Sequence, residues 1–120
     1  MERILVTPRS ITKAGGHPGL KSFTEMGYEV VFSRAGVQPS EQDLLELLPG
    51  CVGMLAGVEP ISATVLESAK GLRVIGRNGV GVDNIDLAAA KRLGVSVVRA
   101  VGANARGVAE LAFGLMLAGV

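Results

Sequence analysis

A glycine-rich turn at residues 77–86 is the part of this sequence whose residue types and spacing best suit chemistry. It reads Arg77-Asn78-Gly79-Val80-Gly81-Val82-Asp83-Asn84-Ile85-Asp86 and lies between an apolar run and a helix-like run. A turn from a strand into a helix directs unpaired backbone N–H groups, and the positive end of the helix, at one point. The turn is therefore predicted to hold a carboxylate or a phosphate.

Two arginines, Arg77 and Arg99, stand where predicted strands end. A guanidinium in such a place can bind a carboxylate or a phosphate through two parallel hydrogen bonds. Each arginine can equally pair with Asp83, Asp86 or Glu59 of the chain itself. The residue types leave both interpretations open.

The glycine-rich turn is a poor match to a dinucleotide site. A dinucleotide fingerprint requires a third glycine where this chain has Asn84, and an acidic residue about 20 positions later, where it has Arg99. Direct NAD binding by the turn is therefore disfavoured, and we assign no cofactor-binding residue. Gly79 and Gly81 would otherwise be ordinary turn residues. We interpret Asp83 and Asn84 as amino-terminal caps of the next helix.

Other reactive side chains lack the neighbours that catalysis needs. His17, the single histidine, stands among glycines and a proline, with no carboxylate nearby to orient it. Cys51 has no basic neighbour to lower its pKa and is predicted to be a half-buried, inert thiol. No His, Cys or carboxylate group shows the spacing of metal ligands. We therefore assign no catalytic and no metal-binding residues.

Composition narrows the class of partner. The 120 residues are 48% hydrophobic and carry a net charge of +1, without clusters of like charge. This favours small molecules or proteins over nucleic acid or an anionic membrane. A single cysteine forms no intramolecular disulfide, and no targeting signal or membrane span is apparent. We expect a cytoplasmic protein.

Five short apolar runs are expected to position these residues. They are rich in β-branched side chains and too continuous for one face to meet water, which is typical of buried parallel strands. Segments with helix start and stop signals follow them, such as 40–48, with a capping-box pattern at Ser40 and Asp43. The runs span 4–6, 30–32, 52–56, 72–75 and 95–98, and the other helical segments span 18–26, 62–70 and 84–93.

This alternation predicts an α/β fold, a flavodoxin-like, doubly wound, five-stranded parallel sheet of order 2-1-3-4-5 with helices on both faces. Five strands also fit half of a classical dinucleotide-binding fold. In either case ligands lie beyond the carboxyl ends of the strands. Those ends are expected at residues 7–11, 57–60, 77–83 and 99–104.

A last helix, 104–120, is apolar on every face from Val108 onward except at Glu110. A helix that covers one side of a sheet should be polar on the other side. We therefore expect this helix to be buried on two sides, as a chain cut from a longer one or as a homodimer contact. The predicted division is a domain at 1–103 followed by this helix.

Several motifs in order resemble the D-isomer-specific 2-hydroxyacid dehydrogenases, and most closely their phosphoglycerate dehydrogenase branch. The resemblance rests on the turn at 77–86, on Gly94-Val95, and on Gly102-Ala103-Asn104-Ala105-Arg106-Gly107-Val108-Ala109-Glu110. It implies the substrate-binding domain of an NAD-dependent oxidoreductase that acts on a small anionic 2-hydroxy or 2-oxo acid. By resemblance, Gly79, Val80 and Gly81 offer backbone N–H groups to the substrate carboxylate, and Asn104 lies near the cleft.

In this family the catalytic arginine, glutamate and histidine and the NAD-binding domain come later in the chain. The resemblance thus implies that NAD belongs to the intact enzyme and that these 120 residues alone are inactive. The chain departs from the family where Arg99-Ala100-Val101 replaces a frequent Asn-Thr-Pro, and where Gly57-Val58 stands in place of an Arg-Ser pair. The alternative function is a free-standing flavodoxin-like module that binds a small ligand or a protein without catalysis.

Overall fold

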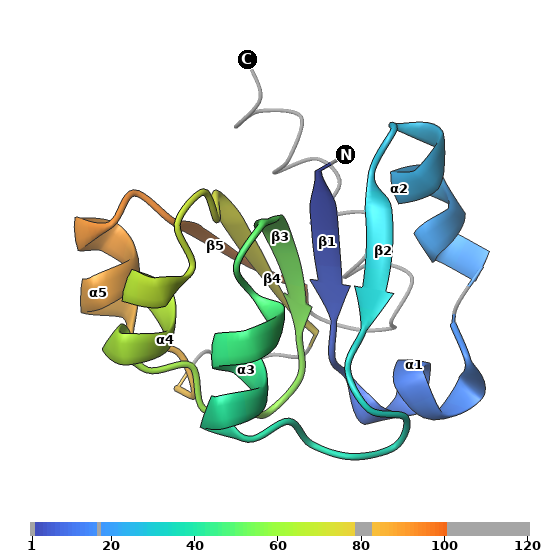
Figure 1. Ribbon diagram of the computed structural model, residues 1–120, viewed down its shortest axis with the longest axis horizontal. Coiled ribbons are helices and arrows are strands. Elements are labelled where there is room, and N and C mark those ends of the chain that lie inside the picture. The colour runs from blue at the N-terminus through green and yellow to red at the C-terminus, as the bar shows by residue number, and fades with distance from the viewer. Residues whose placement is uncertain (1, 17, 79–82, 101–120) are drawn as a thin grey trace.

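Parallel strands form the centre of the molecule, shown in Figure 1 as a computed structural model. The structure describes residues 2–16, 18–78 and 83–100. Within them the strands pair in the order β2-β1-β3-β4-β5, all parallel, so the predicted flavodoxin-like order is confirmed. The strands are β1 Arg3–Val6, β2 Glu29–Phe32, β3 Cys51–Ala56, β4 Val74–Asn78 and β5 Ser96–Ala100.

Burial explains why the strands could be read from the sequence. All six residues of β3 are buried, because β3 lies between β1 and β4 and has both of its faces covered. Successive side chains of a strand point to opposite faces of the sheet. The run in β3 therefore lies in the middle of a sheet covered on both sides, whereas the run in β2 lies at an edge, where Phe32 is 40% exposed, so its predicted burial is wrong.

Helices lie on both faces of the sheet, as expected. Leu5, Met54 and Ile75 pack into one core cluster with residues of α3, α4 and α5, the helices on the near face in Figure 1. Ile4 and Leu55 pack on the opposite face with residues of α1 and α2. The helices are α1 Arg9–Ala14, the 3-10 turn η1 Pro18–Leu20, α2 Lys21–Glu25, α3 Glu41–Leu47, α4 Ala63–Ser68 and α5 Leu87–Arg92.

Capping explains where two of the predicted helices begin. At α3, the Ser40 side chain accepts a hydrogen bond from Asp43 N, and the Asp43 side chain accepts one from Ser40 N, which confirms the capping box. The hydrogen bond from the Ser40 backbone holds the pKa of Asp43 below its ordinary value. At α4, the Ser62 side chain accepts from Val65 N.

The segment after β1 differs from the prediction. Residues 7–11 were expected to be a strand-end loop, yet α1 begins at Arg9, and the single helix expected at 18–26 is η1 followed by the short α2. Pro8 precedes α1 with φ −54°, and Gly15 ends it with φ 79°. Proline before a helix and glycine after it are ordinary boundary signals. The helix is short enough to have lacked a clear apolar period.

Candidate functional site

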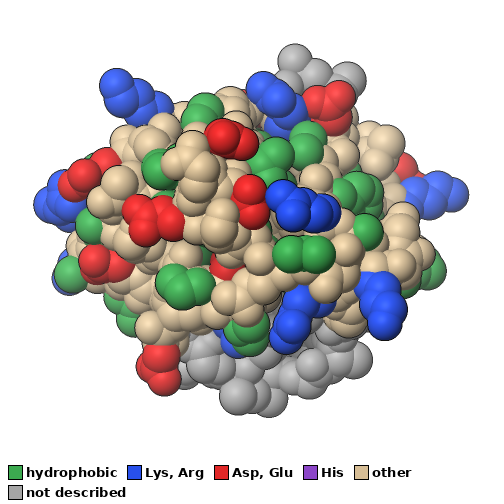
Figure 2. Space-filling model, turned by 60° about the horizontal axis from the view of Figure 1, so that its bottom comes forward, with side chains coloured by type: hydrophobic (Ala, Val, Ile, Leu, Met, Phe, Trp, Pro, Cys, Tyr) green, Lys and Arg blue, Asp and Glu red, His purple; other side chains and the backbone are tan. Residues whose placement is uncertain are grey.

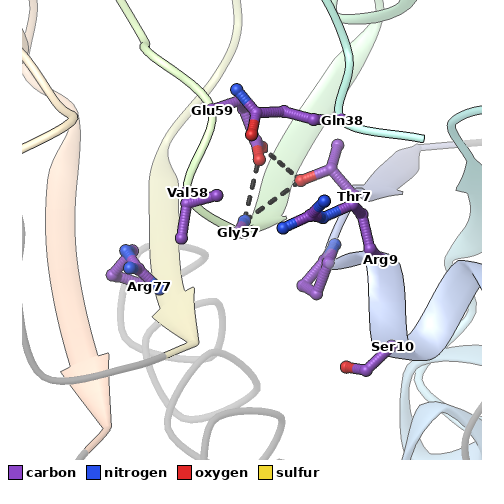
Figure 3. Close-up of a pocket in the computed structure, with 9 residues that line it drawn as sticks. Thr7, Arg9, Ser10, Gln38, Gly57, Val58, Glu59 and Arg77 are labelled. Atoms are coloured by element: carbon purple, nitrogen blue, oxygen red, sulfur yellow. Dashed lines mark hydrogen bonds between the residues drawn. The ribbon is translucent and has the colours of Figure 1, made fainter. Parts of the chain in front are cut away.

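A pocket of about 260 Å³ opens beyond the carboxyl ends of β1, β3 and β4. Parallel strands end at the same edge of a sheet, so side chains far apart in the sequence meet there. In this sheet the chain passes from β1 to β2 on one side and then to β3 on the other, and ligands of such sheets lie at this switch point. The lining residues, drawn in Figure 3, are Thr7, Pro8, Arg9, Ser10, Gln38, Gly57, Val58, Glu59 and Arg77.

Thr7 and Gly57 join the ends of β1 and β3 at the base of the pocket. Thr7 N donates to Leu55 O over 3.0 Å, which continues the ladder between the two strands. Gly57 N in turn donates to Thr7 Oγ1 over 3.2 Å. Hydrogen bonds of the backbone and of the Thr7 side chain therefore hold the ends of β1 and β3 together at the switch point.

Glu59 is buried beside this junction, with 1% of its surface exposed. The Thr7 hydroxyl donates to Glu59 Oε2, and Gly57 N donates to the same oxygen over 3.3 Å (Figure 3). The sequence indicated Glu59 as a possible partner for an arginine, without indicating its burial. Its burial results from contacts with Thr7, 52 positions away, which no local pattern reveals.

Asn84 connects the loop after β3 to the end of β4. Its Nδ2 donates to the carbonyl oxygens of Gly57 over 3.1 Å and Glu59 over 2.9 Å. Its Oδ1 accepts from Arg77 Nε over 3.1 Å. The adjacent backbone strengthens the link, because Ile61 N donates to Asn84 O over 2.7 Å. The Asn84 side chain thus holds both the loop after β3, which forms a wall of the pocket, and Arg77, which lines it.

Two capping expectations at this turn are wrong. The amino-terminal cap of α5 is Asp86, whose Oδ1 accepts from Ala89 N over 3.0 Å, and it is neither Asp83 nor Asn84. Asn84 is needed for the loop contacts instead. A backbone N–H group at the start of α5 is therefore bonded to a carboxylate of the chain itself. This end of the helix does not contribute to the anion site that the turn suggested.

The structure brings part of the predicted substrate site to the pocket. Arg77 lines it, and its Nε donates to the Asn84 amide oxygen. Arg99 lies in β5, but its side chain is outside the described part of the chain. The other predicted contacts, Gly79, Val80, Gly81 and Asn104, lie outside the described residues, as do His17 and the helix expected at 104–120.

Cys51 is more buried than expected, with 1% of its surface exposed. Burial raises the pKa of its thiol. Because the thiolate is the nucleophilic form, a raised pKa makes this cysteine a poor nucleophile. Cys51 belongs to the core cluster on the side of α3 and plays no part in the pocket.

The described residues include no group of three or more His, Cys, Asp or Glu side chains placed to hold a metal ion. Nor does any helix within them have the length and apolar character needed to cross a membrane.

Figure 2 brings the carboxyl-terminal edge of the sheet forward. On it, Lys and Arg side chains gather toward the half where α1 lies, and Asp and Glu side chains lie mostly on the other half.

Gly57 has no room for a side chain, which leads to a first prediction. A Cβ added there would lie 3.0 Å from Glu59 Oε1 and 3.2 Å from Pro8 Cα. The Pro8 backbone is buried and has little freedom to move, so Gly57→Ala is expected to lower the free energy of unfolding by about 1–2 kcal/mol. Urea denaturation measures this. A Gly57→Ala variant as stable as the unaltered chain would contradict this crowding.

Comparison with known proteins agrees with this architecture. The family model "D-isomer specific 2-hydroxyacid dehydrogenase, catalytic domain" matches residues 10–114. The chain is 53% identical over 58 residues to D-3-phosphoglycerate dehydrogenase from Archaeoglobus fulgidus, covering 48% of this chain and 11% of that protein. It is 40% identical over 79 residues to hydroxypyruvate reductase from Thermotoga maritima, covering 65% of this chain and 26% of that one.

Among solved structures, the TT0316 protein from Thermus thermophilus superposes with a TM-score of 0.70 at 36% identity. The match covers 79% of this chain and 29% of that protein. The chain thus spans about a quarter or less of the curated relatives that it matches. The family model covers most of the chain, including strands β2 to β5 and the pocket residues from Ser10 onward. The chain therefore belongs to the D-isomer specific 2-hydroxyacid dehydrogenase family, matching the catalytic domain of those enzymes.

Proposed function

We propose that this chain is the substrate-binding part of an NAD-dependent D-2-hydroxyacid dehydrogenase and binds a small 2-hydroxy or 2-oxo acid anion in the pocket at the switch point. One observation carries the proposal: Arg77 lines that pocket, and Asn84 holds its Nε. A guanidinium with a fixed plane suits a planar carboxylate, which it can bind through two bonds.

The same proposal assigns the remaining predicted contacts. Gly79, Val80 and Gly81 would donate backbone N–H groups to the carboxylate, and Asn104 would lie beside the cleft, by resemblance to the family. A further domain of the intact enzyme would hold NAD, which would supply the chemistry of hydride exchange at C2 of the substrate. We assign no residue of this chain to NAD or to acid–base catalysis. Residues 1–120 by themselves are expected to give no NAD-dependent rate, because the reacting groups must be held together.

The names of the relatives narrow the substrate. One is a hydroxypyruvate reductase and another a D-3-phosphoglycerate dehydrogenase. The corresponding 2-oxo acids are hydroxypyruvate and its phosphate ester, so these are the ligands of first choice for this pocket.

Amide-resolved NMR tests the proposal directly. Hydroxypyruvate is expected to bind with a dissociation constant on the order of millimolar, equivalent to about −4 kcal/mol, and to shift amides near Thr7, Gly57 and Arg77. The Arg77→Gln variant should bind at least about tenfold more weakly, since a bond to a charged group is worth about 1.5–3 kcal/mol. NADH should shift none of these amides. The proposal would be contradicted if these amides shifted with NADH alone, or if neither compound shifted them.

A further inference from the structure

We propose that Arg9 is a specificity-determining residue that binds a second anionic group of the substrate, a phosphate or a carboxylate at the end of the molecule away from C1. This inference rests on the proposed function, because Arg77 is taken to bind the carboxylate at C1. It predicts that the site prefers 2-oxo acids with two anionic groups over those with one.

The placement of Arg9 is fixed by its neighbours in the chain. It is the first residue of α1, and Pro8, buried before it, connects it to the end of β1. Further along the same helix, Ile11 and Thr12 are buried and anchor α1 against the protein. The base of the Arg9 side chain is therefore held at the rim of the pocket, although the side chain itself is exposed.

Arg9 and Arg77 reach the same pocket from different strands. Arg9 follows β1 and Arg77 belongs to β4, with Gly57 and Val58 of the loop after β3 between them (Figure 3). The figure shows the Arg9 guanidinium extended from α1 toward Gly57, and Arg77 on the far side of Val58. Two positive groups on opposite sides of one pocket suit a ligand that carries negative charge at both ends.

Other charges in the described part of the protein do not neutralise Arg9. Three arginines elsewhere on the described surface have carboxylate partners, in the pairs Arg3–Glu29, Arg73–Glu2 and Arg92–Glu67. Within the described residues Arg9 forms no ion pair of this kind. Glu59 is the one carboxylate among the described lining residues, and its Oε2 accepts from Thr7 and Gly57.

Gln38 lines the pocket as well, so a side-chain amide is available in the same pocket to donate to a further oxygen of the ligand. Phosphate and carboxylate share the chemistry that a guanidinium recognises, and the two are distinguished by the ligands chosen for the test. Val58, which is 52% exposed, supplies an apolar surface between the two cationic ends.

Titrations of the full 120-residue chain with three 2-oxo acids, followed by NMR, test the inference. The ligands are hydroxypyruvate, hydroxypyruvate phosphate and 2-oxoglutarate. We expect the phosphate ester to bind the unaltered chain about tenfold or more tightly than hydroxypyruvate. In Arg9→Gln this preference should fall to about twofold, because the phosphate loses the guanidinium that binds it. Arg9→Lys should keep part of the preference for the phosphate ester. Tighter binding of 2-oxoglutarate than of hydroxypyruvate would show that the second anionic group can also be a carboxylate.

Lys70→Gln is the matched control, because Lys70 is exposed, lies after α4 and does not line the pocket. It removes one positive charge and should leave all three affinities unchanged. An equal loss in both variants would overturn the role of Arg9 and reveal an effect of net charge. If hydroxypyruvate binds but its phosphate binds no better, the inference fails while the proposed function stands. If neither compound binds, both fail.

Discussion

Glu59→Ala is expected to lower the free energy of unfolding by about 3 kcal/mol, because it removes the acceptor at the centre of the switch point. Two donors, the Thr7 hydroxyl and Gly57 N, meet at its Oε2 in a buried place. Hydrogen bonds to charged groups contribute about 1.5–3 kcal/mol, and the emptied volume adds a further cost. Part of the lost free energy of unfolding is recovered, since Thr7 Oγ1 can still donate to Leu55 O, 3.3 Å away. Urea denaturation followed by circular dichroism measures the change.

Two further variants isolate the cause. Glu59→Gln conserves the shape and one acceptor oxygen, so it should cost clearly less than the alanine. Glu25→Ala removes an exposed carboxylate from α2 and should change stability by no more than about 0.5 kcal/mol. If Glu59→Ala were as stable as the unaltered chain, the desolvation cost of burying this carboxylate would outweigh its bonds, and the network would not be what holds β1 to β3.

The sheet was predictable because its signal is local. A short run such as 52–56 is apolar at every position, as a strand with two covered faces requires, and the structure buries all of β3. The boundary of α3 was equally local, since Ser40 and Asp43 stand three positions apart and bond to each other. Where one short stretch of chain determines the structure, the sequence is sufficient.

The network behind the pocket was not predictable in this way. Asn84 looked like a helix cap because Asn is a good cap, but Asp86 takes that place and Asn84 bonds to residues 25 and 27 positions earlier. Glu59 likewise meets Thr7 across 52 positions. The sheet order decides which strand ends become neighbours, so these partners follow from the topology and not from any pattern near either residue.

Asn84→Asp should cost about 2–3 kcal/mol of stability, the other large effect expected in this protein. The substitution conserves size but replaces Nδ2, which donates to the carbonyls of Gly57 and Glu59, by an oxygen that repels them. Two hydrogen bonds are lost, and the new carboxylate oxygen faces the carbonyl oxygens of Gly57 and Glu59. This costs more than the loss of one ordinary hydrogen bond. The contact with Arg77 survives and gains charge. Urea denaturation gives the stability, and the hydroxypyruvate titration gives the binding.

The two readouts separate the roles of this side chain. Gln42→Glu is the matched control, because it makes the same amide-to-carboxylate exchange at an exposed position of α3 away from the pocket, and it should change stability by no more than about 0.5 kcal/mol and leave binding unaltered. Because the loop after β3 and Arg77 both line the pocket, we expect Asn84→Asp to weaken hydroxypyruvate binding about threefold or more even where the chain is fully folded. Loss of stability with unchanged affinity in the folded protein would mean that Asn84 fastens the loop alone, and that the place of Arg77 in the pocket does not depend on it.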